Sequence, residues 1–335
     1  MRATSSRWIA GVLGGLLALA GCGETTTVGG PGGGDGDGDG NGDGDGDGDG
    51  DGGGTDMGET ISESTTLSGD IHLAGNTTIA PDVDVVIEAG SSVTAAAGAK
   101  LIVQGTLLID GTADATVSMM PDDVAAPWGG VVAESGGSVT MRYVTGTAVQ
   151  TLLACKSGAV TCELDRLDLT DVGAVIQAAS TATLKASRVQ GMSNGAINVS
   201  AGGTLTVSDS DFSQSSHDLV TASGGNLIVE YTNIGGTIDT YEHCNLHVGY
   251  ADSLTITRSN IVTGAYGIMI GDVADASITY NNWEGNDEDV SPVGEPTNAD
   301  FTHNWWGGHD PPTLGGNYDF TSEESVRVED AGPRI

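Results

Sequence analysis

The chain has 335 residues, including 54 glycines, 46 acidic residues and 11 basic residues, and its formal net charge is −35. This acidic balance disfavours nucleic acid and anionic membrane faces as partners, because both carry charge of the same sign. The basic residues form no cluster, so an anionic polysaccharide could bind only through bridging cations or a local basic pocket.

Residues 1–21 have the composition of a secretory signal. Arg2 and Arg7 precede an apolar stretch, residues 8–20, that ends in small residues before Cys22. The stretch is too short for a transmembrane anchor. It resembles the lipobox of bacterial lipoproteins, which implies cleavage before Cys22 and acylation of this cysteine. Gly23 stands where an aspartate would signal inner-membrane retention, so we expect an outer-membrane or cell-surface protein that contacts the membrane only through its lipid anchor.

Residues 22–58 are predicted to form a disordered linker. Between residues 29 and 54 the sequence is almost entirely glycine and aspartate, with nothing to bury. A calcium-binding nonapeptide array would need a recurring apolar residue, which is missing here. We therefore expect no cofactor, and calcium remains open only as a loosely condensed ion. A flexible chain of about 35 residues spans roughly 30–35 Å and would hold the folded part away from the lipid surface.

Residues 59–320 are predicted to form one repeat domain. Most units have 22 or 23 residues, and one spacing of 27 separates Val229 from Ile256. A unit of this size cannot bury its own apolar side, so it must stack on copies of itself. The repeat is anchored by the residues Val139, Cys162, Leu184, Val207, Val229, Ile256, Ile278 and Phe301.

Each repeat shows the alternation of apolar and polar residues that is typical of a β-strand. Small or apolar residues two before and five after each anchor are expected to face inward, as do Leu205 and Phe212 around Val207, or Val160 and Leu167 around Cys162. A second short strand lies about ten residues upstream of the anchor, and no stretch after residue 60 has a sustained helical period. Helices are therefore expected to be minor.

Four residues after the anchors come Asp211, Asn233, Asn260 and Asn282. Asparagine tolerates the left-handed backbone of a tight corner, and stacked asparagine amides hydrogen-bond to one another. Leucine-rich repeats have a similar length, but their fixed Asn/Cys–Leu spacing is absent. The pattern resembles the pectate-lyase-like superfamily, which has an asparagine ladder at one corner. The resemblance implies an all-β fold: a right-handed, single-stranded parallel β-helix with coils of about 22 residues.

Motifs at both ends of the repeat region resemble bacterial surface β-helix proteins. They are Val86-Ile-Glu-Ala-Gly and Pro127-Trp-Gly-Gly-Val near the start, and Asn304-Trp-Trp-Gly-Gly near the end. The resemblance covers residues 65–320, and residues 321–335 are expected to form a C-terminal tail. Such proteins include adhesins, polysaccharide-binding proteins and enzymes, so the fold leaves the function open.

Three cysteines follow Cys22. An exported compartment permits disulfides, and Cys155 and Cys162 flank one turn at a distance that suits a local bridge. The repeat register also suits Cys162 as a small buried core residue. Cys244 lies several coils away and is expected to stay free and buried. The cysteines do not have the spacing of zinc ligands, and no metal site is predicted.

The catalytic signatures of related enzymes are missing. Polygalacturonase-like hydrolases carry Asn-Thr-Asp, Asp-Asp, Gly-His-Gly and Arg-Ile-Lys, of which only Asp122-Asp123 has a counterpart, in the wrong part of the chain. The Arg-x-Pro-x-x-Arg pattern of pectate lyases is absent. Uronate β-elimination usually needs a cationic base and cationic groups beside the carboxylate, and this chain has few basic residues.

The long spacing between Val229 and Ile256 contains an insertion, residues 235–243, and insertions in solenoids often lie on the binding face. His and Asp grouped there could bind a metal or transfer protons, whereas aromatic rings with Asn and Asp suit a neutral sugar. A solvated loop without a ligand is the third interpretation. The candidate catalytic residues are His217, Asp218, His243 and His247. The candidate ligand-binding residues are Asp239, Tyr241, Asn245 and Tyr266.

Trp283 and Trp306 occupy the inward column and are expected in the core, which leaves Trp305 as the exposed aromatic candidate. We expect a monomeric surface protein for binding, adhesion or envelope structure, with a polysaccharide or another cell-envelope component as its partner. The alternative is a polysaccharide lyase, epimerase or glycoside hydrolase that uses the cluster beside the insertion.

Overall fold

The computed structural model describes residues 55–193, 195–237 and 243–334. In these residues the backbone forms short strands and turns without an α-helix, and hence no helix there could span a membrane. The predicted signal peptide, Cys22 and most of the Gly/Asp linker lie outside the described residues.

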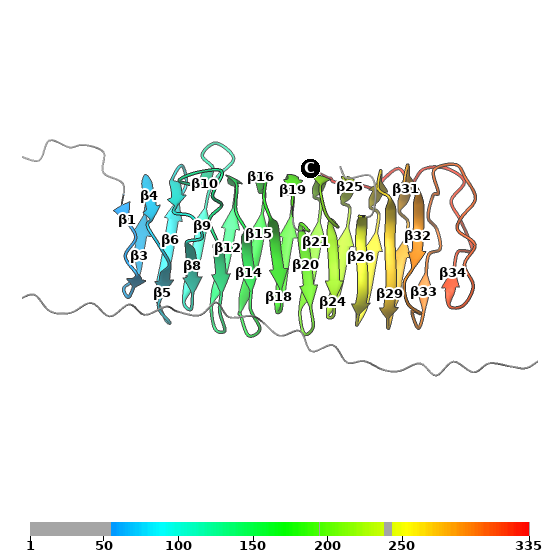
Figure 1. Ribbon diagram of the computed structural model, residues 1–335, viewed down its shortest axis with the longest axis horizontal. Helices are drawn as coiled ribbons and strands as arrows, with labels where there is room; N and C mark the ends of the chain where they lie inside the picture. The colour runs from blue at the N-terminus through cyan, green and yellow to red at the C-terminus, as the bar shows by residue number, and fades with distance from the viewer. Residues whose placement is uncertain (1–54, 194, 238–242, 335) are drawn as a thin grey trace, which may run out of the picture. The chain divides into compact units, whose positions relative to one another are not determined.

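Three parallel sheets, which we name A, B and C, run along the domain (Figure 1). Each complete coil contributes one strand to each sheet, and sheet C has one additional strand at its C-terminal end. Sheet A contains β1 Thr55–Asp56, β4 Asp70–Leu73, β7 Ser92–Ala95, β10 Val117–Pro121, β13 Val144–Thr147, β16 Asp168–Thr170, β19 Arg188–Met192, β22 Asp211–Ser215, β25 Asn233–Thr237, β28 Asn260–Val262 and β31 Asn282–Glu284. Sheet B contains β2 Thr60–Ile61, β5 Thr77–Ile79, β8 Lys100–Val103, β11 Gly130–Ala133, β14 Thr151–Cys155, β17 Ala174–Ala178, β20 Ile197–Ser200, β23 Val220–Ser223, β26 Cys244–Ala251, β29 Tyr266–Val273 and β32 Glu288–Pro292. Sheet C contains β3 Thr65–Leu67, β6 Asp84–Glu88, β9 Thr106–Asp110, β12 Ser138–Arg142, β15 Thr161–Asp165, β18 Thr181–Lys185, β21 Thr204–Ser208, β24 Asn226–Glu230, β27 Ser253–Thr257, β30 Ala276–Thr279, β33 Ala299–Asp300 and β34 Tyr318–Asp319.

Equivalent residues of successive coils lie directly beside one another. In sheet C, Leu184 pairs with Val207, Val207 with Val229, Val229 with Ile256 and Ile256 with Ile278, and all five side chains are fully buried. This column confirms the predicted parallel β-helix. The buried Phe212, Trp283 and Trp306 line the same core from the sheet A side, as predicted.

The register of the first two anchors is wrong by two residues. Leu164, not Cys162, pairs with Leu184, and Met141 pairs with Leu164, so Cys162 and Val139 stand one inward position earlier on their strands. Because strand side chains alternate, a slip of two residues still points the predicted side chains inward. It moves Val160 into the preceding turn, however, where this residue is 67% exposed.

The corner between sheets C and A has a left-handed residue two positions after the anchor. In five successive coils the left-handed residues, with φ between 48° and 59°, are Asp209, Tyr231, Arg258, Tyr280 and His303. The predicted ladder two positions later is confirmed by hydrogen bonds from Asn260 Nδ2 to Asn233 Oδ1 at 2.7 Å and from Asn282 Nδ2 to Asn260 Oδ1 at 2.8 Å. The left-handed backbone predicted for these asparagines is wrong, since Asn233, Asn260 and Asn282 have no positive φ.

A second polar ladder, which the sequence did not predict, fills the inside of the same corner. Asn281 Nδ2 donates to Ile256 O at 2.9 Å, and its Oδ1 accepts the Ser259 N–H at 2.9 Å. These bonds satisfy backbone groups that the turn would otherwise leave unpaired in the interior. The ladder consists of the fully buried residues Ser187, Ser210, Thr232, Ser259, Asn281 and Asn304.

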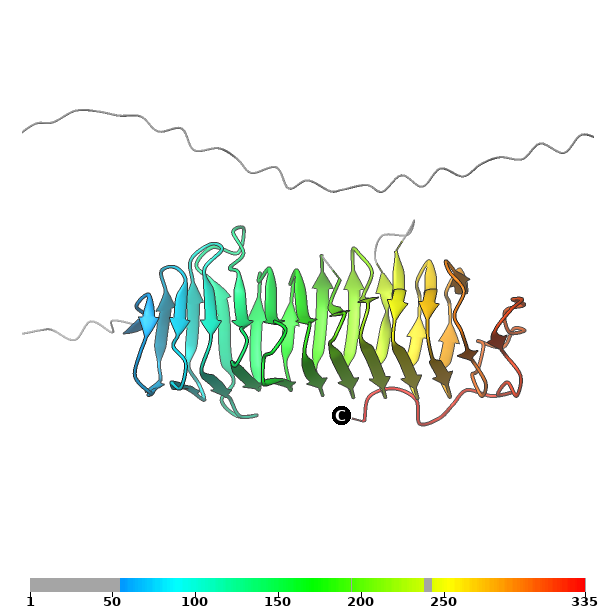
Figure 2. The same cartoon turned by 90° about the horizontal axis from the view of Figure 1, so that it is seen from below.

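The C-terminal strap, residues 324–334, runs back along this corner toward the middle of the domain (Figure 2). Val328 exchanges two hydrogen bonds with the Asn282 amide, at 2.8 and 3.1 Å. Farther along, Arg334 binds the Asp209 carboxylate at 2.6 and 2.8 Å. The strap therefore covers the asparagine ladder at Asn282. The sequence predicted residues 321–335 only as a tail beyond the β-helix domain.

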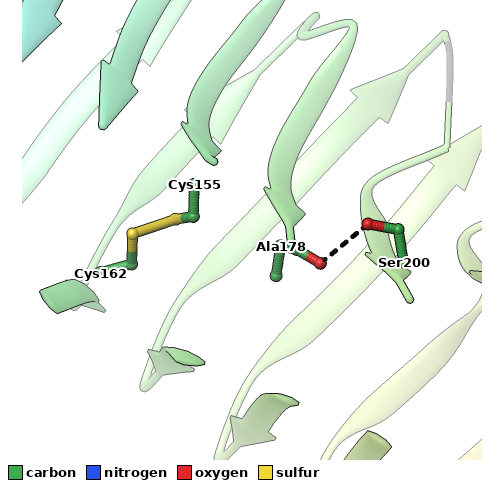
Figure 3. The surroundings of a disulfide bond; sticks show 4 residues. All are labelled: Cys155, Cys162, Ala178 and Ser200. Carbon is green, nitrogen blue, oxygen red and sulfur yellow. Dashed lines mark hydrogen bonds between the residues drawn. A yellow bond between two sulfur atoms is a disulfide. The ribbon is translucent and has the colours of Figure 1, made fainter. Parts of the chain in front are cut away.

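A disulfide joins Cys155 at the end of β14 to Cys162 in β15, with 6.4 Å between the two Cα atoms (Figure 3). The disulfide cross-links the two ends of the turn from sheet B to sheet C within one coil. In the following coils the figure shows Ser200 Oγ donating to Ala178 O at 3.4 Å. Among the cysteines that the structure describes, Cys244 is free and buried.

Candidate functional site

The predicted histidines gather at the corner between sheets A and B in two consecutive coils. His217 and Asp218 lie in the turn between β22 and β23, while His243 directly precedes β26 and His247 lies within it. Strand β23 pairs in parallel with β26, and the Leu219 N–H donates to Cys244 O at 3.1 Å. The stacking of equivalent turns thus brings residues 217–218 beside residues 243–247.

Asp218 is the centre of this group, which we call the Asp218 cluster. Its side chain is only 8% exposed, and its Oδ1 accepts the backbone N–H of Cys244 at 2.8 Å. Burial alone would oppose ionisation of this carboxyl. The hydrogen bonds from Cys244 N–H and from His247, together with the charges of His247 and His217, outweigh burial and lower the pKa of Asp218 below its ordinary value.

The three histidines contact Asp218 in different ways. His247 Nδ1 lies 2.9 Å from Asp218 Oδ2, His243 Nδ1 lies 3.6 Å from Asp218 Oδ1, and the His217 and His243 rings stack with centroids 4.5 Å apart. The backbone N–H of Asp218 donates to His217 Nδ1 at 2.8 Å. All three side chains are partly exposed, between 31% and 49%, so the cluster opens to the surface.

Cys244 belongs to this cluster, although the sequence predicted it only as a free core residue. Its sulfur lies within 4.8 Å of the ligand atoms of Asp218 and His247. Burial, together with the charge and hydrogen bonding of Asp218, raises the pKa of the thiol. The only sequence signal for this role was the position of Cys244 next to His243, which gains meaning once the register with Asp218 is known.

An open hollow of about 380 Å³ adjoins the cluster on the outer face of sheet B, between β23 and β26. Strand β26 carries one extra residue, Gly249, because Ala222 pairs with Val248 whereas Ser223 pairs with Tyr250. Such a β-bulge re-aims the side chain that follows it. Tyr250, which is 49% exposed, and His247 line the hollow together with Thr221, Ala222, Ser223 and Gly249.

Of the predicted ligand-binding residues, the structure describes Asn245 and Tyr266. Neither forms a recorded hydrogen bond with a residue of the Asp218 cluster. Asn245 is fully buried, and its Nδ2 donates to Val262 O at 3.0 Å and to Asn286 Oδ1 at 3.1 Å. Asn245 therefore joins its coil to the following coils, and its role in ligand binding stays a prediction. Tyr266 on β29 is half-buried and pairs with Cys244 on the neighbouring strand β26. Asp239 and Tyr241 lie outside the described residues.

Other hollows offer less convergent chemistry. Trp305 is half-buried under the Arg327 guanidinium of the C-terminal strap and lines a hollow of about 200 Å³. A hollow of about 470 Å³ at the C-terminal end is lined by Glu295, Leu314 and Tyr318, among others. Neither brings several histidines to one carboxylate, as the Asp218 cluster does.

The arrangement supports two kinds of chemistry. A buried carboxylate that holds a partly exposed imidazole orients that ring for proton transfer or for metal binding. The neighbouring hollow offers a phenol ring and hydroxyl groups, which suit stacking and hydrogen bonding to a polar ligand.

Comparison with known families adds one finding. The family described as "right handed beta helix region" matches residues 129–305, which is more than half of the chain and runs from β11 past β33. No curated protein and no solved structure gave a match. The matched range includes the Asp218 cluster and the adjoining hollow.

Replacing Asp218 by asparagine should lower the free energy of unfolding of the metal-free protein by roughly 1–3 kcal/mol at neutral pH, because a charged acceptor for Cys244 N–H and His247 is lost. The folded pKa of Asp218 lies below its unfolded value, so its contribution is complete above about pH 4 and is lost as the pH falls through the folded pKa. Denaturant unfolding of both chains, with a chelator present, at about pH 7 and about pH 3 measures the difference.

The exposed Asp168 on β16 provides the control, since Asp168→Asn should change stability little at either pH. A stability difference for Asp218→Asn that stays constant or grows toward about pH 3 would contradict this electrostatic role.

Proposed function

Because the chain belongs to the right-handed β-helix family, we propose that it is an exported surface protein that binds neutral carbohydrate on the outer face of sheet B. Membership of the family supports a carbohydrate-related or surface protein in general terms. The specific proposal rests on the hollow beside Tyr250 and on the side chains around it.

The outer face of sheet B presents rows of polar side chains from neighbouring coils. One row contains Asn198, Thr221 and His247, and the next contains Ser200, Ser223 and Tyr250. Asn198 Nδ2 donates to Thr221 Oγ1 at 2.6 Å, so this part of the row is already held in place. Repeated donors and acceptors at a fixed strand spacing fit the repeated hydroxyl groups of a glycan chain.

Tyr250 carries the proposal most directly. The bulge at Gly249 exposes its ring beside the hollow, and its hydroxyl donates to Asp252 Oδ1 at 3.2 Å. A ring fixed by its hydroxyl can stack on the apolar face of a sugar while nearby hydroxyl groups bind the sugar edge. This is the single observation on which the carbohydrate proposal depends.

The charge of the chain favours neutral glycans as ligands. The net charge of −35 repels uronic acids and sulfated sugars, and His247 is the only basic side chain that lines the described hollow. A neutral polysaccharide of a cell envelope or of another organism's surface meets no such barrier.

An enzyme remains the second candidate, and the Asp218–His247 contact at 2.9 Å favours it. A partly exposed imidazole oriented by a buried carboxylate can act as a general base, which a lyase or an epimerase needs. The binding protein is the first candidate because the polar rows and Tyr250 extend over a wider face than the Asp218 cluster.

The glycan proposal predicts that the soluble chain, with Cys22→Ser to prevent lipid attachment, binds neutral glycans on an array. Tyr250→Ala should weaken the selected glycan roughly tenfold, as expected when an exposed aromatic anchor is removed. Tyr280→Ala is the matched control, because Tyr280 is also an exposed tyrosine but lies at the corner between sheets C and A, where its ring stacks on His303.

Equal affinity of the Tyr250→Ala and Tyr280→Ala chains would contradict binding at this hollow. Release of sugar products from the bound glycan, abolished by His217, His243 and His247 substituted together, would favour the enzyme instead.

Lipid attachment at Cys22 is also part of the proposal, supported by the lipobox-like residues before it. In a bacterial host, the unaltered chain should incorporate labelled palmitate and partition into a detergent phase, while Cys22→Ser should do neither. Palmitate incorporation that persists in Cys22→Ser would contradict attachment at this residue.

A further inference from the structure

The Asp218 cluster places nitrogen, oxygen and sulfur donors in two overlapping groups of three. The ligand atoms of His217, Asp218 and His243 lie within 4.8 Å of one another, and so do those of Asp218, Cys244 and His247. Both sets share the Asp218 carboxylate, so an ion beside this group would meet donors from two coils. The corner between sheets C and A is filled instead by serine, threonine and asparagine.

The hydrogen bonds distinguish the donors within the cluster. His217 accepts the Asp218 N–H through Nδ1, which keeps this nitrogen engaged and stacks the ring against His243. His243 Nδ1 and His247 Nδ1 contact the Asp218 carboxylate instead, at 3.6 and 2.9 Å. An ion that replaces these contacts would therefore gain two imidazoles without breaking a backbone hydrogen bond of His217.

We propose that Asp218, Cys244 and His247 bind one transition-metal ion, with Zn²⁺ as the reference ion. His243, whose Nδ1 lies 3.6 Å from the same carboxylate, would complete the coordination by a turn of its partly exposed ring, which stacks on His217. Two imidazoles, one carboxylate and one thiolate form the mixed donor set that Zn²⁺ accepts in a four-coordinate site. Calcium does not fit, because it requires six to eight oxygen ligands and this group offers one carboxylate.

The fold explains why sequence spacing did not reveal this site. Asp218 lies 25 residues or more before the other three ligands, and only the pairing of β23 with β26 brings them together. Cys244 is also the one described cysteine outside the Cys155–Cys162 disulfide, so it has a free, buried thiol beside Asp218. The ion would lie beside the hollow, since His247 belongs to both groups.

Metal binding is tested on the whole soluble chain with Cys22→Ser, stripped with a chelator and titrated with Zn²⁺ by calorimetry. We expect one tight equivalent, and a loss of affinity greater than about tenfold in the double variant His243→Ala/His247→Ala. The aspartate-rich residues 29–54 are retained in every chain, so weak cation condensation there cancels in the comparison.

His72→Ala is the matched control, because His72 also contacts carboxylates, Asp56 and Asp122, each at 3.1 Å, but has no second histidine in its group. This variant should bind Zn²⁺ like the parent chain. Equal Zn²⁺ affinity in the double variant and in the parent, or only weak binding in the parent itself, would overturn the proposal.

A second measurement does not depend on the double variant folding well. His247→Gln keeps a donor for Asp218 but is a poor metal ligand, and it should show the same loss of Zn²⁺ affinity.

The contribution of Cys244 is tested with Co²⁺. Co²⁺ bound to the parent chain should produce a thiolate-to-cobalt charge-transfer band that Cys244→Ser removes. One tightly bound Co²⁺ without this band would overturn the assignment of Cys244. The test uses no glycan, so its outcome is independent of the carbohydrate proposal.

Discussion

The structure depends on equivalent side chains of successive coils lying directly over one another. A coil of this size buries its apolar residues only against the coils before and after it, so the register of one coil fixes the next. The constraint extends to polar residues, since the buried ladder from Ser187 to Asn304 and the outer asparagine ladder satisfy the same corner in coil after coil. The C-terminal strap completes the corner by binding the Asn282 amide and Asp209.

The same constraint places the candidate site. Asp218 and His243 are neighbours in space only because β23 and β26 pair, and the insertion before β26 supplies His243 at that corner. The extra residue Gly249 then opens the hollow on sheet B. The insertion before β26 thus adds His243 to the Asp218 cluster, and the bulge within β26 lies at the hollow beside it.

Much of the fold could be predicted from the sequence, because the apolar residues recur at a nearly constant spacing from Leu184 onward. The register failed at Val139 and Cys162, where an apolar residue two positions away fits the pattern equally well. The grouping of the histidines near Asp218 was predictable from the insertion. The position of Cys244 beside Asp218, the hydrogen bonds of Asn245 and the bulge at Gly249 were not predictable, since each depends on which residue of the neighbouring coil lies opposite.

The most direct test of stacked coils is the distance between outward residues of sheet C, measured by electron spin resonance with paired spin labels. Glu163 and Ser277 are five strand pairings apart, and Glu163 and Thr255 are four. At about 4.8 Å per pairing, stacked coils should give backbone separations of about 24 and about 19 Å. If the two label pairs do not differ in separation by about one strand spacing, or if their separations scale with the number of intervening residues, the coils are not stacked in this way.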